Sequence, residues 1–310
     1  MIFDKSKNKI IIWGLRKKWH THRFIHKAFY ENAKKLGYKT IWVEDEKKNQ
    51  KYIQSGDLII ASEVQGKMVL EKFSIEDYNI PIRDDIKYCL HNFKNIFKDR
   101  LNHNNYINLG VYTKEAESSD IKIDTARYFS TKTNTLYQPW GTDLLPHEFK
   151  KPTYNNNKFV FWIGSIWDNK LNQGNLLSIR KLRIVLQKHS VYFLSLRFIP
   201  DWLNIFFIRC SRMAPAIAGQ YQVDINYLPC RMFKNISYGQ LGITNVKKFK
   251  DILKESFIYG NTIEELIDNS INLSEKEYIG LIKQQQMSIE KYTYKNSIEN
   301  IIHFLFSKPC

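Results

Sequence analysis

The chain has 310 residues, of which 43% are apolar and 14% aromatic, enough for about two domains with buried cores. Its 47 Lys and Arg residues outnumber 31 Asp and Glu, and the net charge of +16 calls for an acidic partner such as a phosphorylated substrate or an anionic membrane surface. The cations are spread along the chain without an RNP-like pattern, zinc-finger spacing or basic recognition helix, so nucleic acid is not expected as a partner. A coding bias toward Ile, Lys and Asn is an alternative source of part of the charge.

No run of 18 or more uncharged apolar residues occurs, and charged residues interrupt the first segment, MIFDKSKNKIIIWGLRKK. We therefore expect neither a signal peptide nor a membrane span. The four cysteines, at positions 89, 210, 230 and 310, lack disulfide or metal-ligand spacing, as is typical of a reducing compartment. The expected location is the cytoplasm, with peripheral attachment to the inner face of the cell membrane as an added option.

The first part of the chain predicts alternating strands and helices. Residues 9–13 (KIIIW) form a continuous apolar run, a helix with apolar positions from Ile25 to Leu36 is closed by Gly37, and residues 39–43 (KTIWV) resume the strand pattern. Residues 58–61 and 88–90 predict further short strands. This order indicates a parallel sheet covered by helices.

Residues 135–158 combine three prolines, a glycine and an asparagine run, which is typical of a connection between domains. We place the boundary between domains 1–147 and 148–310. Strands are expected at 159–163 (FVFWI) and 191–196, with a helix between them, so a second α/β domain is predicted. Capping-box pairs predict the start of two later helices, and a break near 292–294 leaves open whether the last helix crosses back. These pairs are Thr262 with Glu265 and Ser274 with Glu277.

Residues 198–215 allow two interpretations. The segment places Trp202 and five other apolar residues beside Arg197, Arg209 and Arg212. It is either an interfacial helix that contacts lipid or a buried helix that covers the sheet, and we favour the buried helix.

Residues 229–245 (PCRMFKNISYGQLGITN) predict a short basic helix, a glycine turn at Gly239 and a buried strand. Arg231 and Lys234 are three residues apart and therefore share one helical face. Two cations near a helix N-terminus can bind an anion. The alternative is an ordinary surface helix with a glycine cap.

Several motifs together resemble the GT-B glycosyltransferases with a group 1-like C-terminal domain. YQPWGTDLLPHEF resembles their interdomain segment, NKFVFWIGSI the strand that opens the second domain, and RMFKNISYGQLGITN, FIYGNTIEELIDNSINL and IEKYTYKNSIENII their C-terminal blocks. The resemblance extends from residue 135 to the end, with a poor match between 197 and 224. It implies two Rossmann-like parallel-sheet α/β domains facing a cleft. It also implies a nucleotide-sugar donor bound by residues of the second domain, namely Gly164, Ser165, Arg231, Lys234, Asn235 and Gly239.

The chain departs from the family pattern at two places. Lys234 stands where the family usually has a glutamate that binds the ribose, and residues 296–299 replace a final arginine region. A charged lysine cannot accept a hydrogen bond, so we expect Lys234 to contact the diphosphate, and the identity of the donor stays open.

Departure of a nucleotide diphosphate builds negative charge that a cation or metal must stabilise. GT-B enzymes generally work without metal, and this chain has no clear Asp-x-Asp strand end, so we expect neither metal nor cofactor and assign the role to Arg231, Lys234 and the Gly164–Ser165 turn. By position after the first strand, His20 or His22 is the candidate general base. The cations of the same loop, Arg16, Lys17, Lys18 and Arg23, are candidates for binding an acidic acceptor. The alternative is a set of solvated loop residues without a catalytic role.

The predicted function is metal-independent transfer of a sugar from a nucleotide-diphosphate donor to a surface glycan or lipid-linked saccharide. The alternative is a non-catalytic protein that binds acidic glycan or anionic membrane on the same scaffold. A third possibility is transfer of a different activated group.

Overall fold

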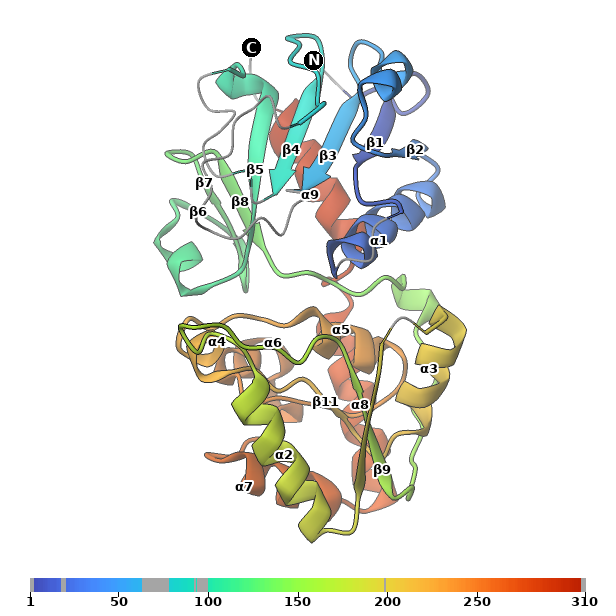
Figure 1. The fold of residues 1–310 in the computed structure, drawn as a ribbon, viewed down its shortest axis with the longest axis vertical. Helices are drawn as coiled ribbons and strands as arrows, with labels where there is room; N and C mark the ends of the chain where they lie inside the picture. The colour runs from blue at the N-terminus through green and yellow to red at the C-terminus, as the bar shows by residue number, and fades with distance from the viewer. Residues whose placement is uncertain are drawn as a thin grey trace. The chain divides into compact units, whose positions relative to one another are not determined.

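The computed structural model describes residues 3–17, 21–62, 78–91, 93, 100–197 and 199–307. Contacts divide the chain into two compact units, each containing helices and strands (Figure 1). Unit 1 comprises Met1–Gly110, Ser118–Gln138 and Tyr294–Cys310, and unit 2 comprises Val111–Glu117 and Pro139–Thr293. The chain passes from one unit to the other at residues 110–111, 117–118, 138–139 and 293–294, whereas the sequence places one boundary at 147–148.

Unit 1 contains an eight-stranded sheet in the order β2-β1-β3-β4-β5-β8-β7-β6. Strands β1 to β5 pair in parallel, whereas β7 is antiparallel to β6 and β8. The sheet is thus largely parallel and Rossmann-like. Its strands are β1 (Lys9–Trp13), β2 (Lys39–Val43), β3 (Leu58–Ser62), β4 (Lys87–His91), β5 (Tyr106–Val111), β6 (Ile121–Asp124), β7 (Arg127–Ser130) and β8 (Thr135–Gln138).

The prediction of an α/β fold with a parallel sheet is confirmed, and β1 and β2 match the predicted ranges. The sequence did not predict β5 to β8. Strands β6, β7 and β8 have only four residues each, and the turns between them need left-handed residues that are not glycine, Ala126 (φ 62°) and Asn134 (φ 51°). Such turns leave little trace in an apolar pattern.

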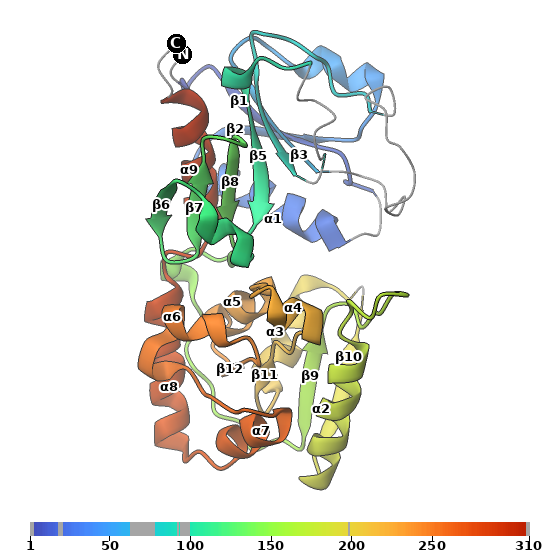
Figure 2. The same ribbon diagram turned by 90° about the vertical axis from the view of Figure 1, so that its left-hand side faces the viewer.

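One face of this sheet is covered by α1 (Thr21–Lys35) and α9 (Tyr294–Phe306), which lie side by side (Figure 2). Ring contacts fix α9 at several places: Phe29 meets Tyr294 at 5.0 Å and Phe129 stacks on Phe304 at 4.3 Å between centroids. The last helix of the chain therefore completes the core of unit 1. Gly37 ends α1 in the left-handed region, at φ 76°, as predicted.

The opposite face of the sheet has its own apolar cluster, in which Ile11, Trp13 and Ile59 pack with Tyr78 and Ile80. Side chains alternate along a strand, so Ile10 and Ile12 point to the other face, and they too are buried. Burial on both faces explains why β1 is apolar at every position from 10 to 13.

Unit 2 also combines strands and helices, but its strands are few. β9 (Phe159–Ile163) pairs in parallel with β10 (Tyr192–Leu196), and β11 (Ala214–Pro215) with β12 (Gly242–Ile243). Among the described residues, these two pairs replace the continuous second sheet that the sequence led us to expect. The helices are α2 (Leu176–Lys188), α3 (Asp201–Cys210), α4 (Gln220–Asp224), α5 (Cys230–Ser237), α6 (Lys250–Leu253), α7 (Ile263–Ile271) and α8 (Glu275–Ile289).

The predicted starts of α7 and α8 are confirmed. The Thr262 hydroxyl accepts from the Glu265 amide at 3.1 Å, and Ser274 forms a full capping box with Glu277. The predicted break before the last helix is also present, since α8 ends at Ile289 and α9 begins at Tyr294.

Helix α3 is less buried than we expected. Ile208 packs in a cluster with Phe161 and Tyr238, but Trp202 is 69% exposed and Phe206 is 54% exposed. The favoured interpretation of a buried helix is therefore only half right. In the part of the chain that the structure describes, no helix has the length and apolarity needed to cross a membrane.

Candidate functional site

Helix α5 follows the predicted order of basic helix, glycine turn and strand. It begins after Pro229, buries Met232, Phe233 and Ile236, and is followed by Gly239 at φ 82° and then by β12. The apolar side chains recur at helical spacing and anchor the helix on the core. Arg231 in the first turn is therefore held by a fixed backbone.

The Arg231 side chain reaches from α5 to the end of β9. Its guanidinium carbon lies 3.8 Å from the centroid of the Trp162 ring, a cation–π contact with a fully buried indole. A Cβ atom on Gly164 would lie 2.5 Å from the Nη2 atom of Arg231, and Gly164 has φ 115°. Glycine is favoured in this turn because L residues rarely adopt its backbone conformation, and a Cβ would also push the guanidinium of Arg231 aside.

None of the described residues provides a counter-ion for Arg231. Neither an ion pair nor a hydrogen bond joins its side chain to another of these residues. Burial lowers the pKa of its guanidinium to about 10, so the group is still charged at neutral pH. Burial also raises the pKa values of the neighbouring Tyr227 and Cys230, which are therefore neutral and cannot balance it. A partly desolvated, unpaired cation is a site for an anion.

The turn beside Arg231 joins β9 to α2. The Ser165 carbonyl accepts from the Asn175 side chain at 3.2 Å, and Gly174 and Gly219 approach so closely that a Cβ on Gly219 would lie 1.8 Å from the Gly174 oxygen. The loop is thus fixed at both ends. The end of a parallel strand and the start of the following helix is where α/β folds bind anionic ligands.

Lys234 has a partner that the sequence did not reveal. Its ammonium lies 4.0 Å from the Asp143 carboxylate, and the Tyr238 hydroxyl donates to both oxygens of Asp143 at 2.8 and 3.0 Å. Asp143 therefore offsets part of the charge of Lys234, and the contact of Lys234 with a diphosphate stays a prediction.

Two other predicted donor residues lie apart from Arg231. Asn235 is buried and donates to the Ala214 carbonyl at 3.2 Å, so it links α5 to β11. Gly239 follows the opposite end of α5, where a Cβ would lie 2.4 Å from the Lys151 carbonyl. The structure gives both residues a role in packing and groups Gly164, Ser165 and Arg231 together.

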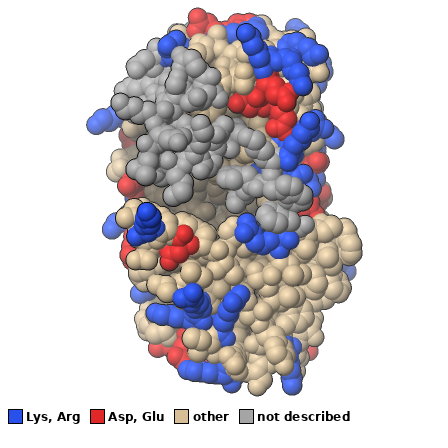
Figure 3. Space-filling model, in the orientation of Figure 1, with Lys and Arg blue, Asp and Glu red and all other residues tan. Residues whose placement is uncertain are grey.

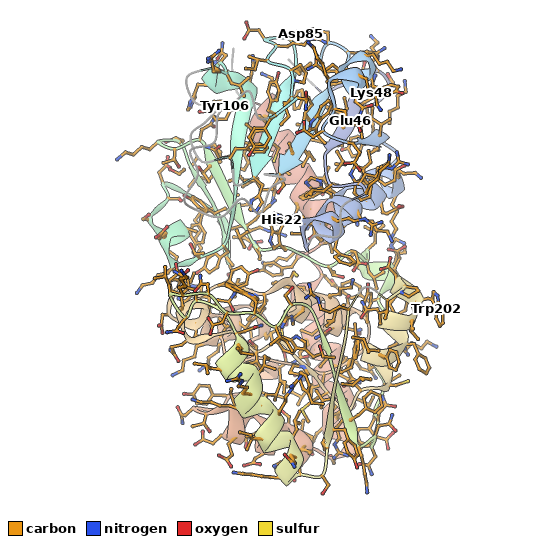
Figure 4. All side chains as sticks on the ribbon, in the orientation of Figure 1. His22, Glu46, Lys48, Asp85, Tyr106 and Trp202 are labelled. Atoms are coloured by element: carbon orange, nitrogen blue, oxygen red, sulfur yellow. The ribbon has the colours of Figure 1, made fainter. Side chains whose placement is uncertain are left out.

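In unit 1, the predicted base His22 lies in the first turn of α1 (Figure 4). Its ring packs edge-on against His91, with 5.2 Å between centroids. His91 ends β4, and its Nδ1 donates to the Leu109 carbonyl at 2.8 Å. Burial lowers the pKa of His91 to about 4, so it is neutral at physiological pH and its Nε2 is an acceptor. His20 and Lys18 lie outside the described residues.

The predicted acceptor cations near His22 partly serve the loop itself. Arg16 donates to the Trp42 carbonyl at 3.1 Å, Arg23 donates to the Arg16 carbonyl at 2.9 Å, and the Lys17 amide donates to Glu44. Both arginines thus use part of their guanidinium groups to bind backbone oxygens. On the face that Figure 3 shows, Lys and Arg side chains are scattered and form no stripe.

Sequence reasoning missed the contact of Trp162 with Arg231 and the pairing of Asp143 with Lys234. Trp162 lies two residues before Gly164 in the strand FVFWI, so a signal for the stacking partner was present. Asp143 is 91 residues from Lys234 in sequence, and only the fold brings them together. Among the described residues, no group of three or more His, Cys, Asp and Glu side chains could hold a metal ion.

No protein-family model matches the chain, and no curated protein sequence matches it. Among solved structures, the N-terminal domain of a trehalose-6-phosphate phosphatase from Candida albicans is similar, with a TM-score of 0.53, 8% identity and 97% of each chain covered. The chain has a GT-B-like fold. A weaker similarity is to OtsA, with a TM-score of 0.45, 10% identity, and 94% of this chain and 80% of OtsA covered. Another is to TarM, with a TM-score of 0.46, 11% identity, and 83% of this chain and 57% of TarM covered. At these identities the likeness concerns the fold alone.

Proposed function

We propose that the protein is a metal-independent glycosyltransferase that moves a sugar from a nucleotide-diphosphate donor to a surface glycan or lipid-linked saccharide. Unit 2 would bind the donor, and the loop after β1 in unit 1 would contact the acceptor, as in a two-domain GT-B enzyme. The protein would act in the cytoplasm, at the inner face of the cell membrane. The observation that carries the proposal is the unpaired guanidinium of Arg231 beside the Gly164 turn.

Arg231 suits a leaving diphosphate. When the bond between the anomeric carbon and the phosphate oxygen breaks, negative charge grows on the diphosphate, and a positioned cation stabilises it by about 3 kcal/mol. Because the face of the guanidinium stacks on Trp162, its N–H edge is available to phosphate oxygens. The hydroxyl of Ser165, next to Gly164 in the same turn, would supply a further donor.

The acceptor hydroxyl must lose its proton if the reaction inverts. His22 or His20 would take that proton. The neutral His91 against the His22 ring adds no positive charge there, so it does not oppose protonation of His22 as a histidinium would.

A panel of nucleoside diphosphates in thermal unfolding and calorimetry tests the donor site. We expect at least one diphosphate to stabilise the wild-type protein and to bind Arg231→Ala about 100-fold more weakly. Arg180→Ala, on the exposed side of α2, is the matched control and should bind as the wild type does. Equal binding by Arg231→Ala and the wild type would remove the central support.

A second candidate function is non-catalytic binding of acidic glycan or anionic membrane on the same scaffold. It is favoured by the pairing of Lys234 with Asp143, which leaves the proposed donor site with a single free cation among the described residues. Salt-sensitive binding to acidic glycan, with no release of nucleoside diphosphate from any donor, would select this function over transfer.

A further inference from the structure

Helix α3 presents an exposed aromatic ridge. Trp202 and Phe206 are 69% and 54% exposed, while Asn204 and Ile208 on the other side of the helix are buried. Trp202, Phe206 and Arg209 have the i, i+4, i+7 spacing of one helical face. Figure 4 shows Trp202 pointing away from the body of unit 2, and the surface over α3 at the lower right of Figure 3 is mainly uncharged.

Positive charge adjoins the far end of this ridge. The Arg209 guanidinium donates to the carbonyls of Lys151 and Tyr238 at 3.1 and 2.8 Å, which brings the exposed residues Lys150 and Lys151 beside the last turn of α3. Among the described residues, no carboxylate pairs with Arg209, Lys150 or Lys151. Arg212, just after the helix, also bonds only to neutral oxygens, those of Asn156 and Ile271.

We propose that α3 docks on an anionic lipid surface, with Trp202 and Phe206 in the interfacial layer and Arg209, Lys150 and Lys151 against the headgroups. Trp and Phe beside cations are what this layer favours, because the rings bury apolar area while the cations meet anionic phosphate. The net charge of +16 adds long-range attraction to the same surface. Asp201, the one acidic residue of α3, lies at the opposite end from Arg209 and is electrostatically coupled to Tyr238.

This docking does not depend on sugar transfer, and its test contains neither nucleotide nor acceptor. Co-sedimentation with phosphatidylcholine vesicles, with and without phosphatidylglycerol, measures the partition of the full chain. We expect binding only to the vesicles that contain phosphatidylglycerol, and weaker binding at high salt. The double variant Trp202→Ala/Phe206→Ala and the variant Lys150→Gln/Lys151→Gln should each lose about tenfold or more in partition.

The matched control is Tyr192→Ala/Met287→Ala, which removes two exposed apolar side chains, 77% and 71% exposed, from β10 and α8. It should bind as the wild type does. A second measurement uses Trp202→Phe, which keeps an aromatic ring at this position. Lipids with brominated chains should quench the tryptophan emission of the wild-type protein more than the emission of Trp202→Phe. The proposal is overturned if the wild-type protein does not bind vesicles that contain phosphatidylglycerol. It is also overturned if Trp202→Ala/Phe206→Ala binds these vesicles as well as the control variant does, or if brominated lipids quench the wild type and Trp202→Phe equally.

Discussion

The guanidinium carbon of Arg231 lies 3.8 Å above the Trp162 ring, so the first turn of α5 and the last residues of β9 meet at one cation. The indole is fully buried, and the arginine is half-buried without a carboxylate among the described residues. Keeping an unpaired charge partly out of water costs free energy of folding, and a bound anion would offset this cost. The following predictions test the site and its surroundings.

Gly164→Ala should disable the site while leaving Arg231 in the sequence. The new Cβ would lie 2.5 Å from Nη2 and would occupy a backbone conformation, φ 115°, that L residues rarely adopt. We expect a loss of about 1–3 kcal/mol in the free energy of unfolding and at least tenfold weaker diphosphate binding. Urea unfolding and calorimetry measure the two effects, and normal binding with a normal midpoint would contradict our account of this turn.

Gly280→Ala is the matched glycine substitution, and its effect should have the opposite sign. Gly280 lies inside α8, where nothing comes within 4 Å of an added Cβ. Alanine favours the helix over glycine by about 0.5–1 kcal/mol, so the melting temperature should rise by about 1–4 °C with diphosphate binding unchanged. A lower melting temperature would show that the position is not open.

Asp143→Asn should strengthen anion binding and weaken the fold. The change leaves the Lys234 ammonium without its carboxylate, 4.0 Å away, and replaces the charged acceptor of the Tyr238 hydroxyl. We expect diphosphate to bind about 2- to 5-fold more tightly, while the free energy of unfolding falls by about 1–2 kcal/mol. The control Asp120→Asn alters an exposed carboxylate of unit 1 that accepts from Thr131, and it should leave diphosphate affinity unchanged. Unchanged affinity in Asp143→Asn would mean that Lys234 does not face the ligand.

His22→Gln should lower turnover without affecting the donor. If His22 is the base, its loss should reduce kcat about 10²- to 10⁴-fold while the Kd for diphosphate in unit 2 is unchanged. Steady-state transfer assays and calorimetry on the same samples separate the two quantities. Full activity in His22→Gln would shift the role to His20 or remove the histidine hypothesis.

His91 should make the protein sensitive to mild acid. Its pKa falls from 6.5 to about 4 on burial, so the unfolded chain binds the proton more readily than the folded one. The stability contribution of neutral His91 is complete above pH 6.5 and is lost as the pH falls toward 4, by about 3 kcal/mol in all. Urea unfolding at pH 7 and 5 should show a smaller difference for His91→Gln than for the wild type. The exposed His303→Gln is the control and should keep the wild-type difference.

Much of the fold could be predicted from the sequence, because continuous apolar runs and capping boxes are local signals. Residues 9–13 and 159–163 are strands as predicted, and Ser274 with Glu277 starts α8. The antiparallel strands β6 to β8 could not be recognised, because each has only four residues. The strand patterns of the second half also could not show that unit 2 has two separate pairs of strands in place of one continuous sheet.

The sequence predicted the meeting of a basic helix with a glycine turn, but it predicted less well which other residues lie beside them. Arg231 and Gly164 were named from sequence and meet in the structure. Asn235 was assigned to the donor although it shares the buried face of α5 with Met232 and Ile236, which the helical period could have shown. The pairing of Lys234 with Asp143 depends on tertiary contact, which no local pattern contains.

The position of α9 has a consequence for biosynthesis. Unit 1 includes residues 1–110, yet one face of its sheet needs a helix that is translated only after all of unit 2. Every residue of unit 2 is translated before that helix, so unit 2 can mature while the apolar face of unit 1 still lacks its cover. A premature stop before Tyr294 would therefore spare the later-made unit and damage the one that was started first.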